Sequence, residues 1–249
     1  DNNYVVSSNV FDAVFDKVKD LDLDQTVKLK GVSEDRADYL VSGMAILKGV
    51  LKVFNVQNIS VSSGGLSEGL IYNYVVPETN DKPLSDMLAY SLDNIRVFYD
   101  MQKSNTLNVY NLALILFKQL KVMHKLPRGY IKPLRIASSM YDCGKRINFD
   151  NYTKYSLDVI INSKLNGVSH KDLLLAGFAC KCQNLDNLSL SEWVKYKDIL
   201  TEDDLDAVRK LGVIINLASK LDSSKSGNVH DISCDILGDS IIMKTIVTV

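Results

Sequence analysis

A short run of serine and glycine is the part of this chain whose residue types are best suited to contact a phosphate. Ser63, Gly64 and Gly65 follow the segment NISVS at 58–62, whose alternation and β-branched residues predict a short strand. A helix is predicted around 68–72. A turn between a strand and a helix start presents backbone N–H groups that an anion can approach closely. We therefore predict phosphate contact at Ser63, Gly64 and Gly65, with a plain strand-to-helix connection as the alternative.

A long amphipathic helix is predicted ahead of this turn. Ser33 suits its N-cap, because a hydroxyl can accept a hydrogen bond from an amide of the first turn. Apolar residues then recur at every third or fourth position, and this spacing predicts that one face of the helix is buried. The residues of that face are Leu40, Met44, Leu47, Leu51 and Phe54.

The helix, strand and turn together resemble part of a known family. RADYLVSG at 36–43 and SSGGLSEG at 62–69 are similar to the second actin-like domain of the exopolyphosphatase / guanosine-pentaphosphate phosphohydrolase family. The family pattern there is S-x-x-R-A-D-x-(apolar)2-x-G, a helix, a strand and S-x-x-G-L-R-E-G. Ser67 stands where the family usually has an arginine, which is associated with the bound phosphate chain. The matching residues are Ser33, Arg36, Ala37, Asp38, Gly43, Ser62, Gly65, Leu66, Glu68 and Gly69.

The composition is that of an ordinary globular protein. Apolar residues make up 46% and charged residues 24%, with a formal net charge of -1. Neither a nucleic-acid-binding nor a membrane-binding surface is indicated, since no excess of basic residues exists. No apolar run reaches the roughly 18 residues that a transmembrane helix needs. The four cysteines lack the spacing of a disulfide framework, which predicts reduced thiols and a cytoplasmic location.

The chain is predicted to be mainly helical, with two parts. Residues 1–80 are read as the later half of an α/β actin-like (ribonuclease-H-type) domain, and the proline-bounded VVPETNDKP at 75–83 as the boundary. Residues 84–249 are read as an all-α HD-like domain that ends in a β-hairpin, with strands at 229–236 and 240–249. Helices are predicted at 84–99, 105–123, 134–143, 153–162, 170–180 and 201–221.

The second part resembles the C-terminal helical domain of the same family, which carries a histidine–aspartate (HD) signature. LASKLDSSKSG at 217–227 is similar to the closing motif of that domain and places Asp222. VYNLALILFKQL at 109–120 is similar to the helix that bears the first histidine, whose position falls on Asn105. The signature itself falls on Tyr141 and Asp142. Other matches in this run are Gly144, Ile147, Asn148, Ser156, Asn162, Ser163, Leu165 and Gly167.

An active HD site joins imidazoles and carboxylates around a divalent metal, which acidifies a bound water. This chain keeps Asp142 and Asp222, but it has Asn105 and Tyr141 at the two defining histidine positions. A phenol with a pKa near 10 is a poor ligand at neutral pH. We therefore predict a vestigial site without metal; the alternative is that the two carboxylates cap helices or pair with lysines. The remaining candidates do not restore the set: Tyr152, Tyr155 and Cys182 stand at positions where the family often has histidine, and His124, His170 and His230 lie elsewhere.

A group of basic residues surrounds the loop at 126–133 and the vestigial motif. It is predicted to line an anion channel, as the interdomain cleft of the family does, and a solvated face is the alternative. Cys180 and Cys182 are spaced like half of a zinc site, but no second pair completes it, so core thiols are predicted. The basic residues are Lys125, Arg128, Lys132, Arg135, Lys145 and Arg146.

The resemblance implies an enzyme that hydrolyses the terminal phosphate of polyphosphate or guanosine pentaphosphate, with Mg²⁺ as its cofactor. That chemistry needs glycine-rich phosphate loops and a carboxylate base, and neither appears in this sequence. We expect a C-terminal fragment that has no catalytic residues and binds the phosphate chain. Because the strand at 58–62 would be left as an unpaired edge, we also expect a homodimer. The alternatives are a metal-dependent HD nucleotidase or phosphodiesterase and a purely structural dimerisation module.

Overall fold

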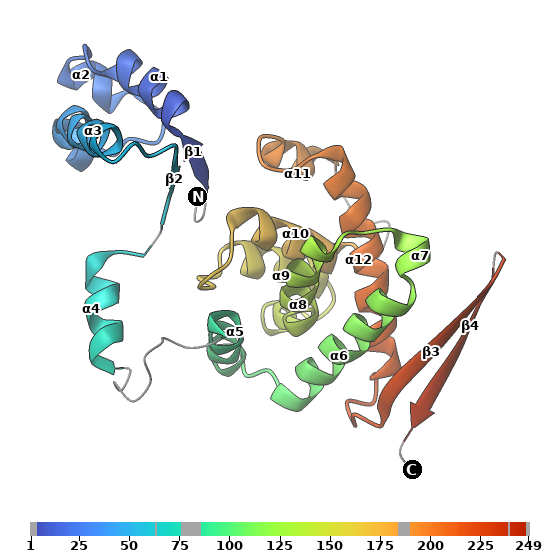
Figure 1. Cartoon of the computed structure of the whole chain (residues 1–249). Helices are drawn as coiled ribbons and strands as arrows, with labels where there is room; N and C mark the ends of the chain where they lie inside the picture. Colours follow the sequence, from blue (N-terminus) through green and yellow to red (C-terminus); the bar gives the residue numbers. More distant parts are fainter. Residues whose placement is uncertain (1–3, 63, 76–85, 184–189, 239, 248–249) are drawn as a thin grey trace. The chain divides into compact units, whose positions relative to one another are not determined.

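The computed structural model describes residues 4–62, 64–75, 86–183, 190–238 and 240–247. The chain divides into two compact units, unit 1 (Asp1–Val76) and unit 2 (Pro77–Val249), which are described separately (Figure 1). Most of the predicted boundary segment at 75–83 lies outside the described residues. Among the residues just given, each unit is mainly helical and contains one small antiparallel sheet. The coarse fold prediction, a mainly helical chain, is confirmed.

Unit 1 contains a two-stranded sheet whose strands are separated in the sequence by three helices and followed by a fourth. Strand β1 (Val5–Ser7) pairs antiparallel with β2 (Asn58–Ser60), so the prediction that this second strand lacks a partner is wrong. Helix α1 (Ser8–Val18) starts where the Ser7 hydroxyl accepts the Val10 N–H. The elements that follow are α2 (Leu23–Val27), α3 (Glu34–Val53) and α4 (Leu66–Val75).

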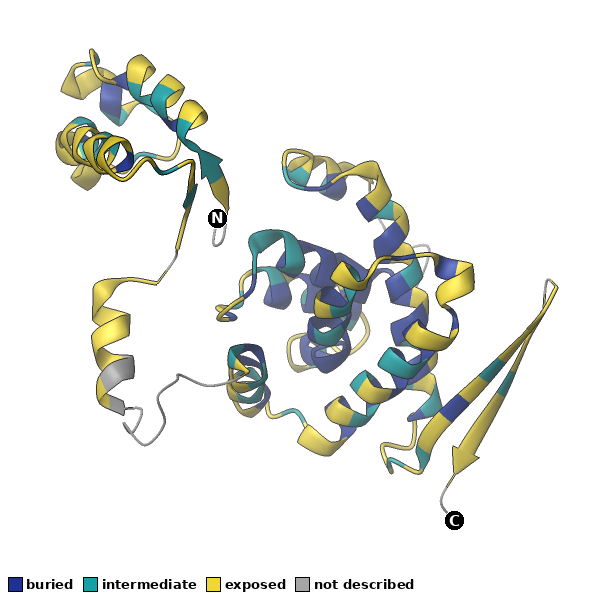
Figure 2. Ribbon diagram, in the orientation of Figure 1, coloured by how far each residue is buried: buried dark blue, intermediate teal, exposed yellow. Residues whose placement is uncertain are grey.

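The long helix α3 is much less buried than its sequence predicts. Ser33 is its N-cap residue but makes no side-chain capping hydrogen bond. Leu51 is buried, whereas Leu47 is 37% exposed and Phe54 is 74% exposed. The prediction of one continuous buried face is therefore wrong at these two positions. The physical reason is that α3 packs mainly on α1 and α2, which cover only part of its apolar surface (Figure 2).

Unit 2 is built from helices in the regions that the periodicity predicts, with boundaries that differ by a few residues. The loop predicted at 126–133 contains a short 3-10 helix and the first turn of α8, which ends at Ser139. The short elements η2, α11 and η4 are not predicted, and α7 falls mostly at the end of the helix predicted at 105–123. The helices are α5 (Met87–Phe98), α6 (Lys103–Gln119), α7 (Lys121–His124), η1 (Arg128–Tyr130), α8 (Ile131–Ser139), η2 (Cys143–Arg146), α9 (Tyr152–Ile161), α10 (His170–Lys181), α11 (Leu190–Trp193), η4 (Val194–Tyr196) and α12 (Glu202–Leu221).

The core of unit 2 lies between α6, α8, α10 and α12, which pack on one another. Figure 2 shows the buried residues concentrated in these helices. Helix α6 is central to this core, and α12 buries most of its apolar face. Leu112, Leu134 and Leu211 come from three different helices and are fully buried. Cys143, Cys180 and Cys182 are buried free thiols, as predicted for the last two.

The predicted C-terminal β-hairpin is confirmed. Strand β3 (Val229–Leu237) pairs antiparallel with β4 (Ser240–Val247), and Asp239 of the predicted turn lies outside the described residues. The hairpin meets α6 through Gln119, whose side-chain amide donates to the Ile232 carbonyl (3.1 Å) and accepts the Cys234 N–H (3.4 Å). Within the described residues, no helix is long and apolar enough to cross a membrane.

Candidate functional site

The serine–glycine turn of unit 1 lies between β2 and α4. The Gly64 N–H donates to the Ser62 hydroxyl (3.1 Å), and the Gly65 N–H donates to Glu68 Oε2 (3.0 Å). These amides were predicted to be open to an anion, but side chains of the chain itself accept hydrogen bonds from both of them. Glu68 lies in the first turn of α4 and so places a carboxylate where an approaching anion would bind. Ser63 lies outside the described residues.

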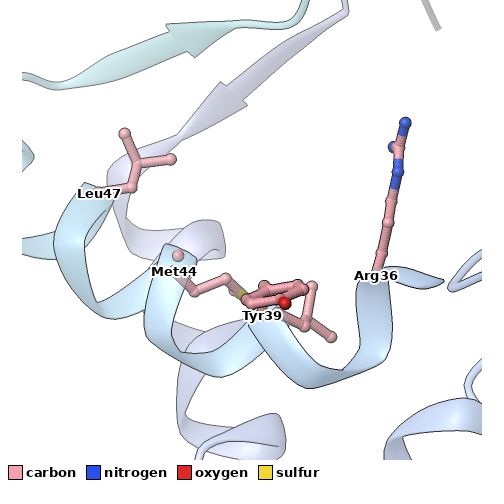
Figure 3. A pocket seen from close by; sticks show the side chains of 6 residues that line it. Arg36, Tyr39, Met44 and Leu47 are labelled. Atoms are coloured by element: carbon pink, nitrogen blue, oxygen red, sulfur yellow. The ribbon is translucent and has the colours of Figure 1, made fainter. Parts of the chain in front are cut away.

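A shallow pocket of about 330 Å³ runs along α3. Its lining includes Arg36 and Gly43, the first and last residues of the RADYLVSG motif. The other lining residues are Tyr39, Leu40, Met44 and Leu47, and the surface of the pocket is almost entirely apolar. In Figure 3 the Arg36 side chain extends away from Tyr39 and Met44. Because no polar groups converge here, the pocket offers no arrangement for catalysis.

In unit 2 the structure brings together the residues of the predicted vestigial site. We call Asn105, Tyr141, Asp142 and Asp222 the Asn105 cluster. Asn105 belongs to the first turn of α6, Tyr141 and Asp142 follow α8, and Asp222 is the C-cap of α12. The Asn105 Nδ2 donates to the Tyr141 hydroxyl at 3.3 Å. All four residues are at least nine-tenths buried.

The turn that carries Tyr141 and Asp142 is fixed by a close approach of two backbone segments. The Gly144 N–H donates to the Ser156 hydroxyl (3.0 Å), which in turn donates to the Tyr141 carbonyl (3.3 Å). A Cβ atom at Gly144 would lie 2.2 Å from the Tyr152 carbonyl oxygen and 2.5 Å from the Ser156 nitrogen. Only glycine fits, so Gly144 and Ser156 are positioning residues for the cluster.

The ammonium groups of two lysines lie near the Asp142 carboxylate. The Lys145 ammonium lies 3.2 Å from Asp142 Oδ2, and the Lys225 ammonium lies 3.9 Å from the same oxygen. The Lys145 ammonium also lies over the Tyr152 ring, 4.9 Å from its centroid. Pairing with lysine, the alternative interpretation of Asp142, is thus what the structure shows.

Burial shapes the chemistry of Tyr141. Burial, reinforced by the Asp142 carboxylate, raises the pKa of Tyr141 to about 12, although the Asn105 hydrogen bond acts in the opposite direction. The negative charge of Asp222 adds to the rise in the pKa of Tyr141. Tyr141 is therefore neutral at physiological pH and is a poorer metal ligand than a histidine would be.

Asp222 holds the end of α12 and the loop that follows it. Its Oδ1 accepts the Gly227 N–H at 3.0 Å, and its backbone carbonyl accepts the Lys225 N–H at 2.9 Å. Asp222 is thus the C-cap residue of α12, as the capping alternative predicts, but its carboxylate binds the following loop. The second carboxylate oxygen, Oδ2, is buried and has no hydrogen-bond partner among the described residues.

A polar pocket of about 340 Å³ opens beside the cluster. Of the six basic residues predicted to form an anion channel, Lys145 and Arg146 are among its lining residues. Lys132 instead donates to the Gly167 carbonyl (2.9 Å), and Arg135 pairs with Asp86 (2.7 Å). The six residues therefore do not form one channel. Lys225 lines the pocket as well and was not predicted as a site residue. It lies in the LASKLDSSKSG motif at 217–227, three residues after Asp222.

Comparison with known proteins supports the resemblance over part of the chain. Residues 1–78 match the Ppx/GppA phosphatase family. The chain is related to the Ppx/GppA phosphatases. A guanosine-5'-triphosphate,3'-diphosphate pyrophosphatase of Aeromonas salmonicida is 28% identical over 153 residues, which are 60% of this chain and 30% of that protein. The protein of the same name from Aeromonas hydrophila is 29% identical over 157 residues, 62% of this chain and 31% of its own length.

A shorter similarity involves a putative exopolyphosphatase of Haemophilus influenzae, 43% identical over 47 residues, which are 19% of this chain and 15% of that protein. The chain thus spans about a third of the length of the two Aeromonas pyrophosphatases named above. The matches cover the chain incompletely, and the family match itself ends at residue 78, close to the end of unit 1.

The Asn105 cluster of this Ppx/GppA-related chain does not fit a divalent metal. Among the described residues, no group of three or more His, Cys, Asp or Glu side chains could hold a metal ion. Asp142 already faces two ammonium groups, which a metal would have to displace.

The other candidate ligands of the chain do not change this result. His124 is committed to the core, since its Nε2 bonds the Phe117 carbonyl (2.7 Å) and its Nδ1 accepts the Leu126 N–H (2.9 Å). Burial raises the pKa of the Cys182 thiol to about 11, which disfavours the thiolate that a metal needs. The absence of bound metal in the protein itself stays a prediction.

Proposed function

We propose that this chain contributes a phosphate-chain-binding part to a Ppx/GppA-type phosphohydrolase, which removes the terminal phosphate of polyphosphate or guanosine pentaphosphate with Mg²⁺. The observation that carries this proposal is the match of residues 1–78 to the Ppx/GppA phosphatase family. The named activity of the Aeromonas relatives supports the guanosine nucleotide as one substrate. Unit 1 then corresponds to part of an actin-like domain, and unit 2 to an HD-like domain that has lost its metal ligands.

Within this proposal, the turn before α4 contacts phosphate through the Gly64 and Gly65 amides. Glu68 occupies the Gly65 amide in the present structure, so a phosphate has to displace the carboxylate. Such an exchange is feasible because the turn and Glu68 are exposed and the competing carboxylate bears less charge than a phosphate chain. Ser67 in place of the usual arginine weakens the contact further, which predicts modest affinity.

A binding experiment tests this role. Polyphosphate is titrated into the purified chain by isothermal calorimetry, and the wild type is compared with Glu68→Ala. Removal of the competing carboxylate should raise the affinity about two- to fivefold, the range of one modest hydrogen bond. Glu34→Ala is the matched control, since Glu34 is likewise an acidic residue in the first turn of a helix of unit 1. Absence of binding, or an equal rise in both variants, contradicts the proposed contact.

The chain alone should release no phosphate from either substrate. The carboxylate base and the paired phosphate loops of the family's chemistry do not appear in this sequence. Phosphate release by the purified chain, with and without Mg²⁺, is the measurement. Turnover that persists through purification and disappears in Asp142→Ala would instead support the alternative function, a metal-dependent HD nucleotidase or phosphodiesterase.

The proposed association into a homodimer rests on exposed apolar residues of unit 1. On α4, Leu66 is 82% exposed and Tyr74 is 92% exposed, and on α3 Phe54 is 74% exposed. Apolar surface of this extent is typical of a covered interface. Sedimentation at tens of micromolar is the measurement, and a single monomeric species contradicts the homodimer.

A further inference from the structure

The turn between α9 and α10 carries the single Asn-Gly pair of the sequence, Asn166 followed by Gly167. Both residues are exposed. The side chain of Asn166 forms no hydrogen bond or ion pair with any residue that the structure describes, and the same holds for the Gly167 N–H. Gly167 has a φ of 71°, a left-handed conformation that glycine adopts without strain. The side-chain amide of Asn166 and the backbone nitrogen of Gly167 are therefore both free to react.

These two groups can undergo a cyclisation that needs no enzyme or cofactor. The Gly167 nitrogen bonds to the Asn166 Cγ, the bond between Cγ and the side-chain nitrogen breaks, and ammonia leaves with the proton of the attacking N–H. The product is a cyclic imide (succinimide), which water opens at either carbonyl to give aspartate or isoaspartate. Asparagine is thermolabile in proteins, and glycine has no Cβ to hinder the attacking nitrogen.

Isoaspartate changes the length of a connection whose two ends are fixed. Leu165, directly before the pair, is 4% exposed, and Val168, directly after it, is 1% exposed. Both side chains belong to the hydrophobic core of unit 2. Isoaspartate routes the backbone through the former side-chain carbon and so adds one carbon atom between these residues. Close-packed side chains cannot absorb the added length without leaving their positions in the core.

Two hydrogen bonds join the same turn to neighbouring helices. The Asn166 N–H donates to the Ser91 hydroxyl on α5 (3.2 Å), and the Lys132 ammonium on α8 donates to the Gly167 carbonyl (2.9 Å). The two backbone groups lie on opposite sides of the bond that the rearrangement alters. A longer backbone cannot keep both hydrogen bonds and both buried side chains in place, so one or more of these contacts must be lost.

We propose that Asn166 is a site of spontaneous deamidation, and that isoaspartate formed there loosens the connection between α9 and α10. The aspartate product keeps the backbone unchanged and adds only a negative charge at an exposed position. The two products therefore differ in their effect, and only isoaspartate disturbs the packing. This inference goes beyond the proposed function and does not depend on it, because no ligand takes part in the reaction.

A time course with the purified full chain measures the reaction. The protein is kept at physiological temperature in mildly alkaline buffer, and peptide mapping by mass spectrometry follows the mass gain that replacement of NH2 by OH causes. Asn162 is the matched control: it is also exposed, but its Nδ2 donates to the Asp158 carbonyl (2.8 Å) and Ser163 follows it. The need to break that hydrogen bond should by itself make Asn162 react about fivefold more slowly than Asn166.

Variants separate the reaction from its structural effect. Asn166→Gln should stay unmodified, because a glutamine has to close a larger ring, and it keeps the backbone contacts of the wild type. Freshly purified Asn166→Asp supplies the charge of the aspartate product with an unaltered backbone. Hydrogen exchange of the amides at 162–169 should be faster in the aged, isoaspartate-containing wild type than in either variant.

Three results would overturn the inference. The first is no mass gain at Asn166 by the time that a sample unfolded in guanidinium chloride is fully converted. The second is an equal rate at Asn166 and Asn162. The third is equal hydrogen exchange in the isoaspartate-containing wild type and in Asn166→Gln aged in the same way, which would show that the turn accommodates the longer backbone.

Discussion

Helix α3 of unit 1 and helix α12 of unit 2 are both twenty residues long, and both carry apolar residues at spacings of three and four. Helix α12 buries that face completely at Val208, Leu211 and Ile215. Helix α3 leaves Leu47 and Phe54 exposed. The difference lies in their neighbours, since α12 packs on α6, α8 and α10, whereas α3 packs mainly on the shorter α1 and α2. Periodicity predicts which face is suited to burial, and the neighbours decide whether burial occurs.

The two helices also differ at their starts. In α12 the Thr201 hydroxyl accepts the Asp204 N–H in a capping box, and Asp204 further pairs with Lys171 at 2.8 Å. In α3 the Ser33 side chain makes no capping bond. Tertiary contacts hold the capping residues of α12 in place, and α3 lacks that support. The comparison predicts that substitutions in unit 2 have large effects and that equivalent ones in unit 1 have small or opposite effects.

The largest difference is expected for two glycine substitutions. Gly144→Ala should destabilise unit 2 by about 4 kcal/mol or more, because the new methyl would overlap backbone atoms that cannot move aside cheaply. Gly49→Ala on α3 meets no atom within 4 Å and should stabilise its helix by about 0.5–1 kcal/mol. Urea unfolding followed by the fluorescence of Trp193 measures the first, and hydrogen exchange of the α3 amides measures the second. Equal effects of the two substitutions on stability would contradict the inferred difference in packing between the two units.

A leucine pair gives the next largest difference. Leu211→Ala creates a cavity at a fully buried position of α12 and should lower the free energy of unfolding by about 3 kcal/mol. Leu47→Ala removes a side chain that is 37% exposed and should change it by less than about 1 kcal/mol. Denaturation midpoints of both variants are compared with the wild type. A loss above 2 kcal/mol for Leu47→Ala, on the scale of core substitutions, would show that α3 is covered in solution.

The smallest of the three effects concerns alkaline pH. The pKa of Tyr141 rises from about 10 in the unfolded chain to about 12 in the folded one. The folded state thus keeps this proton longer, so its contribution is complete below pH 10 and is lost as the pH rises from about 10 to about 12. The resulting decrease in the free energy of unfolding should approach about 2 kcal/mol.

Other groups titrate in the same range, so the measurement is a difference. Unfolding free energies of the wild type and Tyr141→Phe are compared at several pH values from 8 to 12. The Phe variant should lose less stability across this range, although it starts lower because Asn105 loses its hydrogen bond. Parallel curves for the two proteins would mean that Tyr141 is accessible to water.

The sequence was sufficient for the features that depend on local pattern. Periodicity placed α6, α12 and the hairpin. The grouping of Asn105, Tyr141, Asp142 and Asp222 in one site was implied by the family resemblance and not by local pattern. The sequence did not predict contacts for which a side chain has several possible hydrogen-bond or ion-pair partners. The capture of the Gly65 amide by Glu68 depends on a rotamer, and the approach of Lys225 to Asp142 depends on the path of the loop after α12. Neither leaves a periodic signal in the sequence.

The side-chain amide of Gln119 makes the two edges of the hairpin different, because it occupies hydrogen-bonding groups of β3. By offering one donor and one acceptor to Ile232 and Cys234, it reproduces the hydrogen bonding of a peptide group from an adjacent strand. The side of β3 that faces α6 is therefore closed to strand addition at its middle. Any chain that extends this sheet has to add along β4, so growth of the sheet is restricted to one side.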